Sequence, residues 1–310
     1  MSLLSPRSVV RLALAALLFC LPHSLRAQDL SPRAYLITPV DGNAVTTTYS
    51  FYDGSLNFNG ALPITDATGI YSVPIFSYYH SFGIFGRSAN IVAALPYGIG
   101  NFQGLEGGVE EHVYRSGLVD SVYRFSVNLK GGPAMAPREF LKWHQKILLG
   151  AGLKVIAPTG QYDRTKLVNW STHRWAFKPE FGYSQRWGNW ILDGYAGVWF
   201  FTTNHEFYPG NVTNTQTPMG SLESHLSYSF TPRLWASADG NFWFGGTSVL
   251  NGSQNSLTQQ ENSRIGATVA FPISKHQSLK FAYSNGTYVR FGGNYQNVSV
   301  AWQYSWIKHP

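Results

Sequence analysis

The chain has 310 residues, of which 13% are charged and 15% are aromatic, and it contains 31 glycines. So little charge and so many rings exclude a disordered chain, a coiled coil and a collagen-like repeat. Beyond the N-terminus no apolar run reaches about 18 residues, so no transmembrane helix is expected. Low charge, many rings, many glycines and interleaved apolar and polar residues together predict a transmembrane β-barrel.

The N-terminus has the features of a secretory signal. Arg7 and Arg11 precede an apolar stretch over 12–21, and the small residue Ala27 follows. A basic start, a short apolar core and a small exit residue typify a signal peptide that is cleaved. We therefore predict that residues 1–27 are removed, with the single cysteine, Cys20. Removal takes away three arginines and no acid, so the net charge falls from +7 to +4 and gives no argument for nucleic acid.

The rest of the chain predicts an all-β domain. Residues 28–42 carry Pro32 and Pro39 and are expected to form an irregular lead-in, and a barrel is predicted over 43–310. Period-2 segments begin at Asn43, and no stretch sustains the 3.6-residue period of a helix. Twelve strands are predicted, over 43–52, 70–80, 87–95, 118–128, 146–157, 173–185, 190–201, 218–230, 234–244, 261–271, 278–284 and 295–307.

The two faces of these strands differ in polarity. Strand 118–128 places Tyr123 and Phe125 on one face and Asp120 and Arg124 on the other. A soluble sandwich also alternates, but it exposes more charge to water than this chain supplies. A membrane barrel turns its apolar face to lipid and lines a lumen with small and polar side chains. Because an open sheet edge is not tolerated in hydrocarbon, the first and last strands must pair.

The connections predict the orientation of the barrel. Long and short connections largely alternate, as expected when external loops are long and periplasmic turns are short. Both termini are then periplasmic, in the bacterial outer membrane, and the strand number is even. The connection over 129–145 falls on the short side but is long. It is either a periplasmic flap or a sign that the strand count is wrong there.

Several stretches of the chain are specific as a set. They are 37–56 (ITPVDGNAVTTTYSFYDGSL), GGPAM with the following Pro137, Glu139 and Phe140, 157–163 (APTGQYD), 173–184 (HRWAFKPEFGYS), 195–202 (YAGVWFFT), 263–272 (SRIGATVAFP), 278–286 (SLKFAYSNG) and 300–306 (VAWQYSW). Together they resemble the MetA-pathway phenol-degradation family of outer-membrane transporters. The resemblance covers nearly the whole mature chain. It implies a channel associated with aromatic degradation, and it brings no catalytic or binding residue with it. Residues 117–120 depart from the family pattern, reading GLVD in place of GLGD.

No enzyme motif is complete in the sequence. There is no G-x-S-x-G elbow and no P-loop, and His205–Glu206 lacks the second histidine of a zincin site. We therefore expect no catalytic activity, no metal and no cofactor. A barrel enzyme that modifies lipids is an alternative, with His173 or His225 beside a serine at the rim.

The predicted inward face carries seven basic and five acidic side chains: Asp120, Arg124, Lys146, Lys154, Arg174, Lys178, Glu180, Asp193, Glu223, Asp239, Arg264 and Lys280. In one interpretation these ions pair with each other and lock a narrow barrel. In the other they form a weakly positive constriction that favours small anions such as aromatic carboxylates. Rings predicted to point inward would stack on an aromatic solute or plug the pore: Tyr195, Trp199, Trp235 and Trp243.

These observations support a first hypothesis, a passive channel for small hydrophobic or aromatic compounds. An alternative from another class is a closed barrel with a structural or adhesive role. In either case the expected partners are outer-membrane lipid and the barrel-assembly machinery, with a small-molecule solute for the channel.

Overall fold

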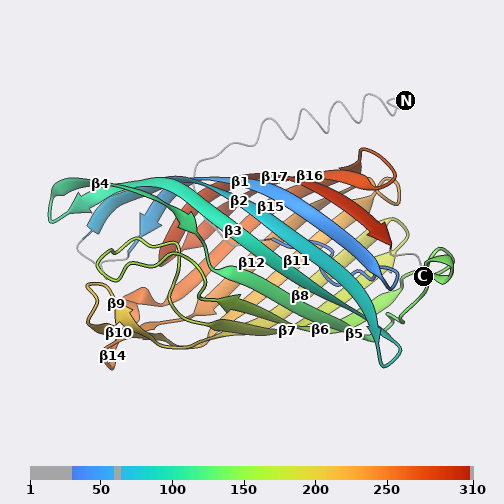
Figure 1. Cartoon of the computed structure of the whole chain (residues 1–310), viewed down its shortest axis with the longest axis horizontal. Helices are drawn as coiled ribbons and strands as arrows, with labels where there is room; N and C mark the ends of the chain where they lie inside the picture. The colour runs from blue at the N-terminus through green and yellow to red at the C-terminus, as the bar shows by residue number, and fades with distance from the viewer. Residues whose placement is uncertain (1–29, 59–63, 308–310) are drawn as a thin grey trace, which may run out of the picture.

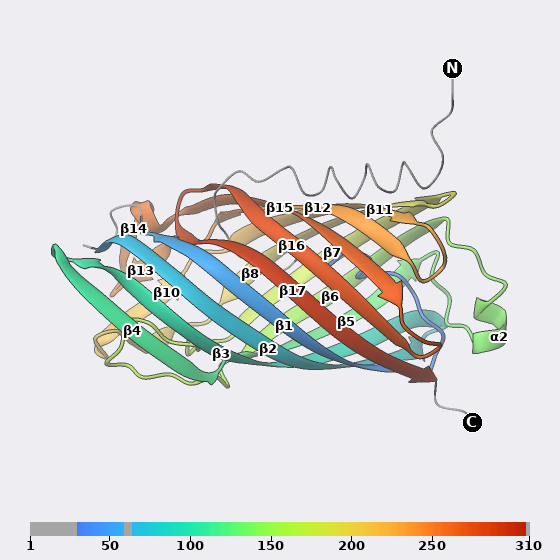
Figure 2. The ribbon, with the colours of Figure 1, turned by 90° about the horizontal axis from the view of Figure 1, so that it is seen from above.

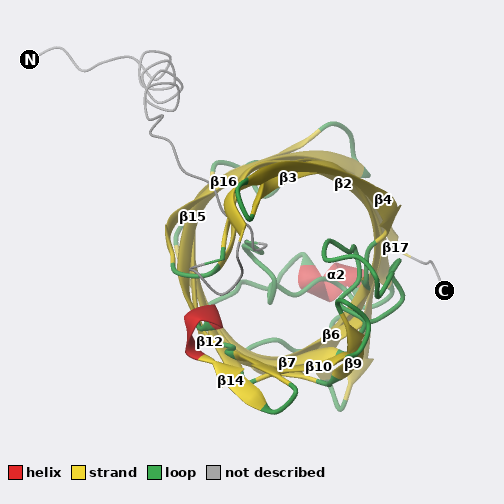
Figure 3. Cartoon of the chain, turned by 90° about the vertical axis from the view of Figure 1, so that its left-hand side faces the viewer, coloured by secondary structure: helices red, strands yellow, loops and turns green. Residues whose placement is uncertain are grey.

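The computed structural model describes residues 30–58 and 64–307, so the predicted signal peptide lies outside the described residues. The strands slant around the long axis of the molecule (Figures 1 and 2) and form a ring when seen along that axis (Figure 3). No helix in this part of the chain is long and apolar enough to cross a membrane. The strands of the barrel are β1 (Gly42–Asn57), β2 (Ile64–Ile84), β3 (Arg87–Glu106), β5 (Ser121–Lys130), β6 (Ile147–Ala157), β7 (Ala176–Trp187), β8 (Trp190–Phe201), β11 (Met219–Ser229), β12 (Trp235–Gly245), β15 (Gln260–Pro272), β16 (Gln277–Val289) and β17 (Gly292–Ile307).

Within the described residues, these twelve strands close into one antiparallel barrel. The first and last strands pair along their whole length, from Gly42 opposite Ile307 to Asn57 opposite Gly292. β2 pairs with β1 on one side and with β3 on the other, which completes the ring. Every backbone group of the spanning wall therefore has a neighbouring strand to bond, as hydrocarbon requires. The predicted fold class and strand number are confirmed.

Burial in the barrel is inverted relative to a soluble protein. Apolar side chains on the outward face are exposed, with Phe181 68% and Ile265 57% accessible. Polar side chains on the opposite face are buried, among them Ser184, His225 and Arg264 at 1% or less. An exposed apolar belt around a polar interior is the surface that a barrel presents to lipid.

The two ends of the barrel differ. At the turn end, where β1 begins and β17 ends, most connections are short: 85–86, 188–189, 230–234 and 273–276. At the loop end, the connections 158–175, 202–218 and 246–259 are long. They carry a second small sheet and a 3-10 turn: β9 (Asn204–Phe207), β10 (Val212–Gln216), β13 (Ser248–Leu250), β14 (Ser253–Asn255) and η1 (Ser256–Thr258).

One region predicted as a loop, 96–117, is instead a tall hairpin at the loop end. β3 continues to Glu106 and pairs with β4 (Val109–Leu118), which leads into β5. Gly107 and Gly108 form the tip with φ of +59° and +85°, a conformation that glycine adopts without steric cost. Glycines at 98, 100 and 104 interrupt the alternation of apolar side chains, so the strand pattern is weak there.

The long connection over 129–145 is a folded flap at the turn end, and the count of twelve strands stands. We call residues 131–146 the flap; it contains the short helix α2 (Pro137–Phe140). The views from the side and along the bore place α2 over the opening of the barrel (Figures 2 and 3). The flap bonds the lead-in, because the Val40 N–H donates to the Met135 carbonyl at 2.9 Å. Ile37, Met135 and Leu148 pack beneath it in an apolar cluster.

A charge on the outer belt should destabilise the barrel in lipid. Phe181 lies midway along β7 and points outward, so Phe181→Arg is expected to cost about 2–4 kcal/mol in the free energy of unfolding from a bilayer. Urea unfolding of the barrel in lipid vesicles measures the change. Phe181→Leu is the matched control and should remain close to the wild type. A neutral effect of the arginine would contradict the assignment of this face to hydrocarbon.

Candidate functional site

The part of the predicted lead-in that precedes β1 in the described residues, 30–41, runs inside the barrel and contacts its inner wall. Tyr35 lies at its centre and is 1% exposed. The Tyr35 hydroxyl donates to Glu180 Oε1 at 3.1 Å, and the Arg124 guanidinium lies 4.6 Å from the centre of the ring. Gly150 and Gly182 form the wall behind the ring, where a Cβ on either would collide with it. Two neighbouring strands therefore provide a niche for this one tyrosine.

Arg33 and Ala34 extend this attachment around the wall. The Arg33 guanidinium donates from Nε to Ser227 Oγ at 3.0 Å and from Nη2 to Ser229 Oγ at 2.8 Å, and it lies over Trp235 at 4.3 Å. The Arg33 N–H donates to Asp193 Oδ2 at 3.2 Å. The Ala34 N–H donates to the Tyr195 hydroxyl at 2.9 Å, and the Ala34 carbonyl accepts from Arg124 at 3.0 Å. The lead-in is thus hydrogen-bonded to β5, β7, β8 and β11, and Arg33 contacts β12 through Trp235.

Five of the twelve charged residues predicted for the inward face are joined, with His225, in one network. Lys178 Nζ lies 2.5 Å from Glu180 Oε2 and 3.1 Å from Glu223 Oε1. Arg124 approaches Glu180 at 3.6 Å. His225 lies between two acids, with Nδ1 2.9 Å from Asp239 Oδ1 and Nε2 3.7 Å from Glu223 Oε2.

A glycine lets Lys178 reach its second partner. Lys178 is on β7 and Glu223 is on β11, and β8 lies between these strands. The stem of Lys178 crosses β8 over Gly197, where a Cβ would lie 3.0 Å from Lys178 Cγ. The bridge therefore depends on the absence of a side chain at this position.

Cations also lie over rings on the inner wall toward the loop end. The ammonium groups of Lys154 and Lys178 are 5.9 and 5.5 Å from the centre of the Trp199 ring. The Arg174 guanidinium lies 4.7 Å from the Phe201 ring and donates to Gln216. Trp199 packs in a buried apolar cluster with Trp243 and Met219. This part of the wall offers both π faces and positive charge.

The remaining predicted residues are dispersed. Arg264 is buried and donates to the Tyr295 carbonyl at 2.7 Å and to Ser284 at 2.5 Å. Asp120 accepts from the N–H groups of Gly160 at 3.1 Å and Thr172 at 2.9 Å, so it anchors the connection 158–175. Lys146 and Lys280 are exposed near the turn end, outside the network.

Sequence analysis missed a cluster of rings at the loop end. Trp170, from the connection 158–175, lies 5.8 Å from Tyr71 and 5.9 Å from Phe102, centre to centre. Tyr71 also stacks on Tyr52 at 4.6 Å. A Cβ at position 98 would collide with Trp170, so the ring of Trp170 can pack there only because residue 98 is a glycine. The run of inward glycines in β3 was the available signal.

The histidines proposed for a lipid-modifying enzyme do not meet a serine hydroxyl. His173 stacks on Tyr162 at 4.6 Å and lies 3.7 Å from Glu206. His225 is enclosed between its two acids. In the described ranges, no ring nitrogen of either histidine has a hydrogen bond to a serine. Nor do these ranges contain a group of three or more His, Cys, Asp or Glu able to hold a metal ion.

The comparisons with known proteins identify the family. A family model described as "Putative MetA-pathway of phenol degradation" matches residues 48–302. The chain belongs to this family. No curated relative matches it.

Solved structures agree with the fold of this phenol-degradation family member. An outer membrane channel from Pseudomonas putida F1 is similar over 90% of this chain and 100% of its own, with 16% identity and a TM-score of 0.74. The beta domain of the Bordetella autotransporter BrkA is similar over 86% and 100%, with 14% identity and a TM-score of 0.50. The fold is that of bacterial outer-membrane barrels. With its exposed apolar belt, this family member is a protein of the outer membrane.

The match to the phenol-degradation family covers one part of the candidate site and leaves out the other. Its range, 48–302, includes the charge network and the rings of the inner wall. The lead-in, which fills the niche of Gly150 and Gly182, lies before it. The attachment of Arg33 and Tyr35 is therefore a feature of this chain that the family match does not cover.

Proposed function

We propose that this barrel is a passive channel for small hydrophobic or aromatic compounds across the outer membrane. The observation that carries the proposal is the inner wall around Trp199 and Phe201, where rings and cations lie side by side. Such a surface attracts an aromatic or weakly anionic solute while holding it loosely, as a channel requires. Membership of a phenol-degradation family supports the same class of solute.

The proposed orientation places the turn end in the periplasm, because short turns face that side in barrels of this kind. Outer-membrane lipid then covers the apolar belt, and the barrel-assembly machinery inserts the chain. The passage needs neither a cofactor nor a nucleotide. As a non-enzyme, the protein in detergent should release no fatty acid from phospholipid.

Planar-bilayer recording tests the proposal. Discrete current steps are expected, with a preference for anions, because Lys154 and Arg174 face the lumen with no acid within 4 Å in the described chain. Lys154→Ala should reduce the anion preference, whereas Lys166→Ala, at the exposed loop end, should leave it unchanged. Unchanged selectivity in Lys154→Ala would refute the role of the inner-wall cations.

A closed barrel with a structural or adhesive role is the second candidate. It is favoured by the lead-in, which lies inside the barrel against its wall, and by the pairing of Lys178 with Glu180 and Glu223. Complete absence of current from protein that is shown to be folded and inserted would support this candidate and contradict the channel.

A further inference from the structure

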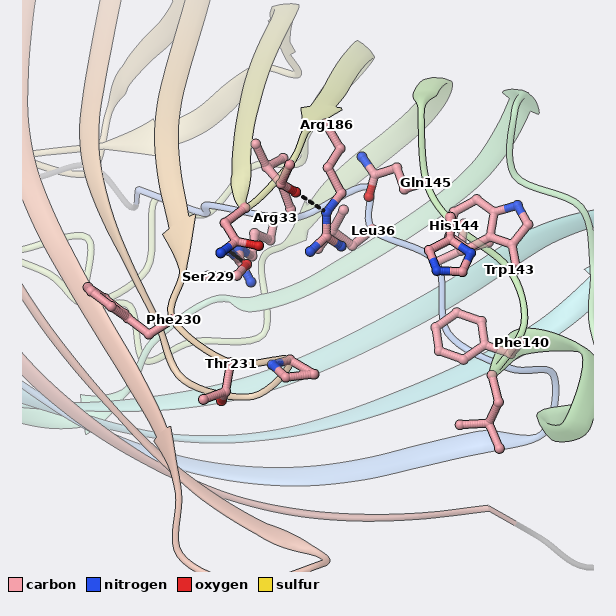
Figure 4. A pocket seen from close by; sticks show the side chains of 16 residues that line it. Arg33, Leu36, Phe140, Trp143, His144, Gln145, Arg186, Ser229, Phe230 and Thr231 are labelled. Carbon is pink, nitrogen blue, oxygen red and sulfur yellow. Dashed lines mark hydrogen bonds between the residues drawn. The ribbon is translucent and has the colours of Figure 1, made fainter.

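A cavity of 830 Å³ opens at the turn end of the barrel (Figure 4). Its walls come from the lead-in, the flap, and the turns 188–189 and 230–234. The size falls within the range of small-molecule sites, about 300–1,000 Å³. None of the residues of the charge network lines it, although Arg33 and Ser229 of the lead-in attachment do.

The lining of the cavity is cationic. Arg33 and Arg186 contribute the positive charge, and no aspartate or glutamate lines the cavity. The Arg186 Nε donates to the Gly188 carbonyl at 3.0 Å, and no carboxylate in the described ranges lies within 4 Å of its guanidinium. Arg33 is fixed in place by Ser227 and Ser229. The two guanidinium groups lie on the same side of the cavity, with Gln145 beside Arg186 (Figure 4).

The flap provides an aromatic wall for the same cavity. Phe140 and Trp143 lie with their ring centres 6.1 Å apart and their planes 24° apart. Figure 4 shows these rings and His144 on the side of the cavity away from Arg33. Leu36 and Ile191 add apolar side chains to the lining. An elongated ligand with a ring at one end and an anionic group at the other would meet suitable chemistry at both.

We propose that this cavity binds aromatic carboxylates of the benzoate class. The carboxylate pairs with the guanidinium of Arg186, whose fork geometry suits two parallel hydrogen bonds. The ring packs against Phe140 and Trp143. The inference rests on the proposed function for its source of ligand, since a solute that leaves the lumen at the turn end enters this cavity. Binding itself is measured without transport.

Calorimetric titration of the mature full-length protein in a non-ionic detergent tests the proposal with three probes. Benzoate carries both ring and charge, benzamide keeps the ring without the charge, and acetate keeps the charge without the ring. Benzoate is expected to bind at least about tenfold more tightly than either of the others, because only it uses both walls. Equal binding of benzoate and benzamide, or no binding of benzoate, overturns the proposal.

Two variants locate the site. Arg186→Gln is expected to weaken benzoate about tenfold and to leave benzamide unchanged. Arg138→Gln removes the same charge from exposed α2 outside the cavity, and it should bind benzoate as the wild type does. Equal losses in the two variants would reveal a general charge effect and overturn the site. Trp143→Leu should weaken benzoate and benzamide alike, and unaltered binding in this variant would also contradict the site.

The outcome is distinguishable from that of the channel proposal. Benzoate binding that depends on Arg186, in a barrel without conductance, would sustain the site and refute the channel. Conductance without benzoate binding would sustain the channel and refute the site.

Discussion

Replacement of both Arg33 and Tyr35 by alanine is expected to raise the single-channel conductance several-fold. These two side chains hold the lead-in to the wall, through Ser227 and Ser229 for the first and Glu180 for the second. Without them, the lead-in loses its side-chain hydrogen bonds to two strands, β11 and β7, and the ring of Tyr35 leaves the niche of Gly150 and Gly182. Water and ions then occupy the freed section of the bore. Planar-bilayer recording of the purified variant measures the change.

A second variant displaces the lead-in without altering it. Gly182→Val places a branched side chain where the Tyr35 ring sits, so it should raise conductance in the same direction. Tyr123→Ala removes a tyrosine from the outward face and serves as the control, with conductance expected to match the wild type. If the double variant and Gly182→Val both conduct as the wild type does, the lead-in is not the obstruction.

The fold could be predicted from the sequence because the chain repeats one simple rule. Alternation in strands such as 146–157 and 261–271 specifies which side meets lipid, and the need to satisfy the backbone in hydrocarbon then requires closure. The hairpin of β3 and β4 escaped prediction because glycines replace the inward side chains there. Trp170, from the connection 158–175, fills the space that a side chain at Gly98 would occupy. The ring that covers this part of the inward face therefore comes from a distant part of the sequence.

The site was less accessible to sequence reasoning, because its contacts join positions far apart in the chain. Alternation places Lys178, Glu180 and Glu223 on the inward face, but pairing of Lys178 with Glu223 depends on Gly197 in the strand between them. The lead-in carries two prolines and no periodicity, so its sequence predicts irregular structure. It does not indicate that this segment lies inside the barrel. The bond from Arg33 to Asp193 spans 160 positions, and no local pattern encodes such a contact.

Lys178→Met is expected to destabilise the barrel by about 3–5 kcal/mol, the cost of breaking a buried ion cluster by removing one partner. Lys178 is 5% exposed and lies between Glu180 and Glu223, at 2.5 and 3.1 Å. Its loss leaves two carboxylates facing each other away from water. The additional change Glu223→Gln removes one of these charges and should recover part of the loss, which a double-mutant cycle quantifies. Urea unfolding, followed by heat-modifiable gel mobility, reports the free energy.

A surface pair provides the matched control for this effect. At the loop end, Lys166 Nζ lies 2.7 Å from Asp163 Oδ2, a distance comparable to those in the buried cluster. The hydrogen bond from Lys166, with those from Thr165, holds the pKa of Asp163 well below its usual range. Both groups are nevertheless exposed, so water and salt screen the attraction, and Lys166→Met should change stability little. Equal stability of Lys178→Met and Lys166→Met would show that burial adds nothing to the inner network, and its ions would then be free to serve the solute.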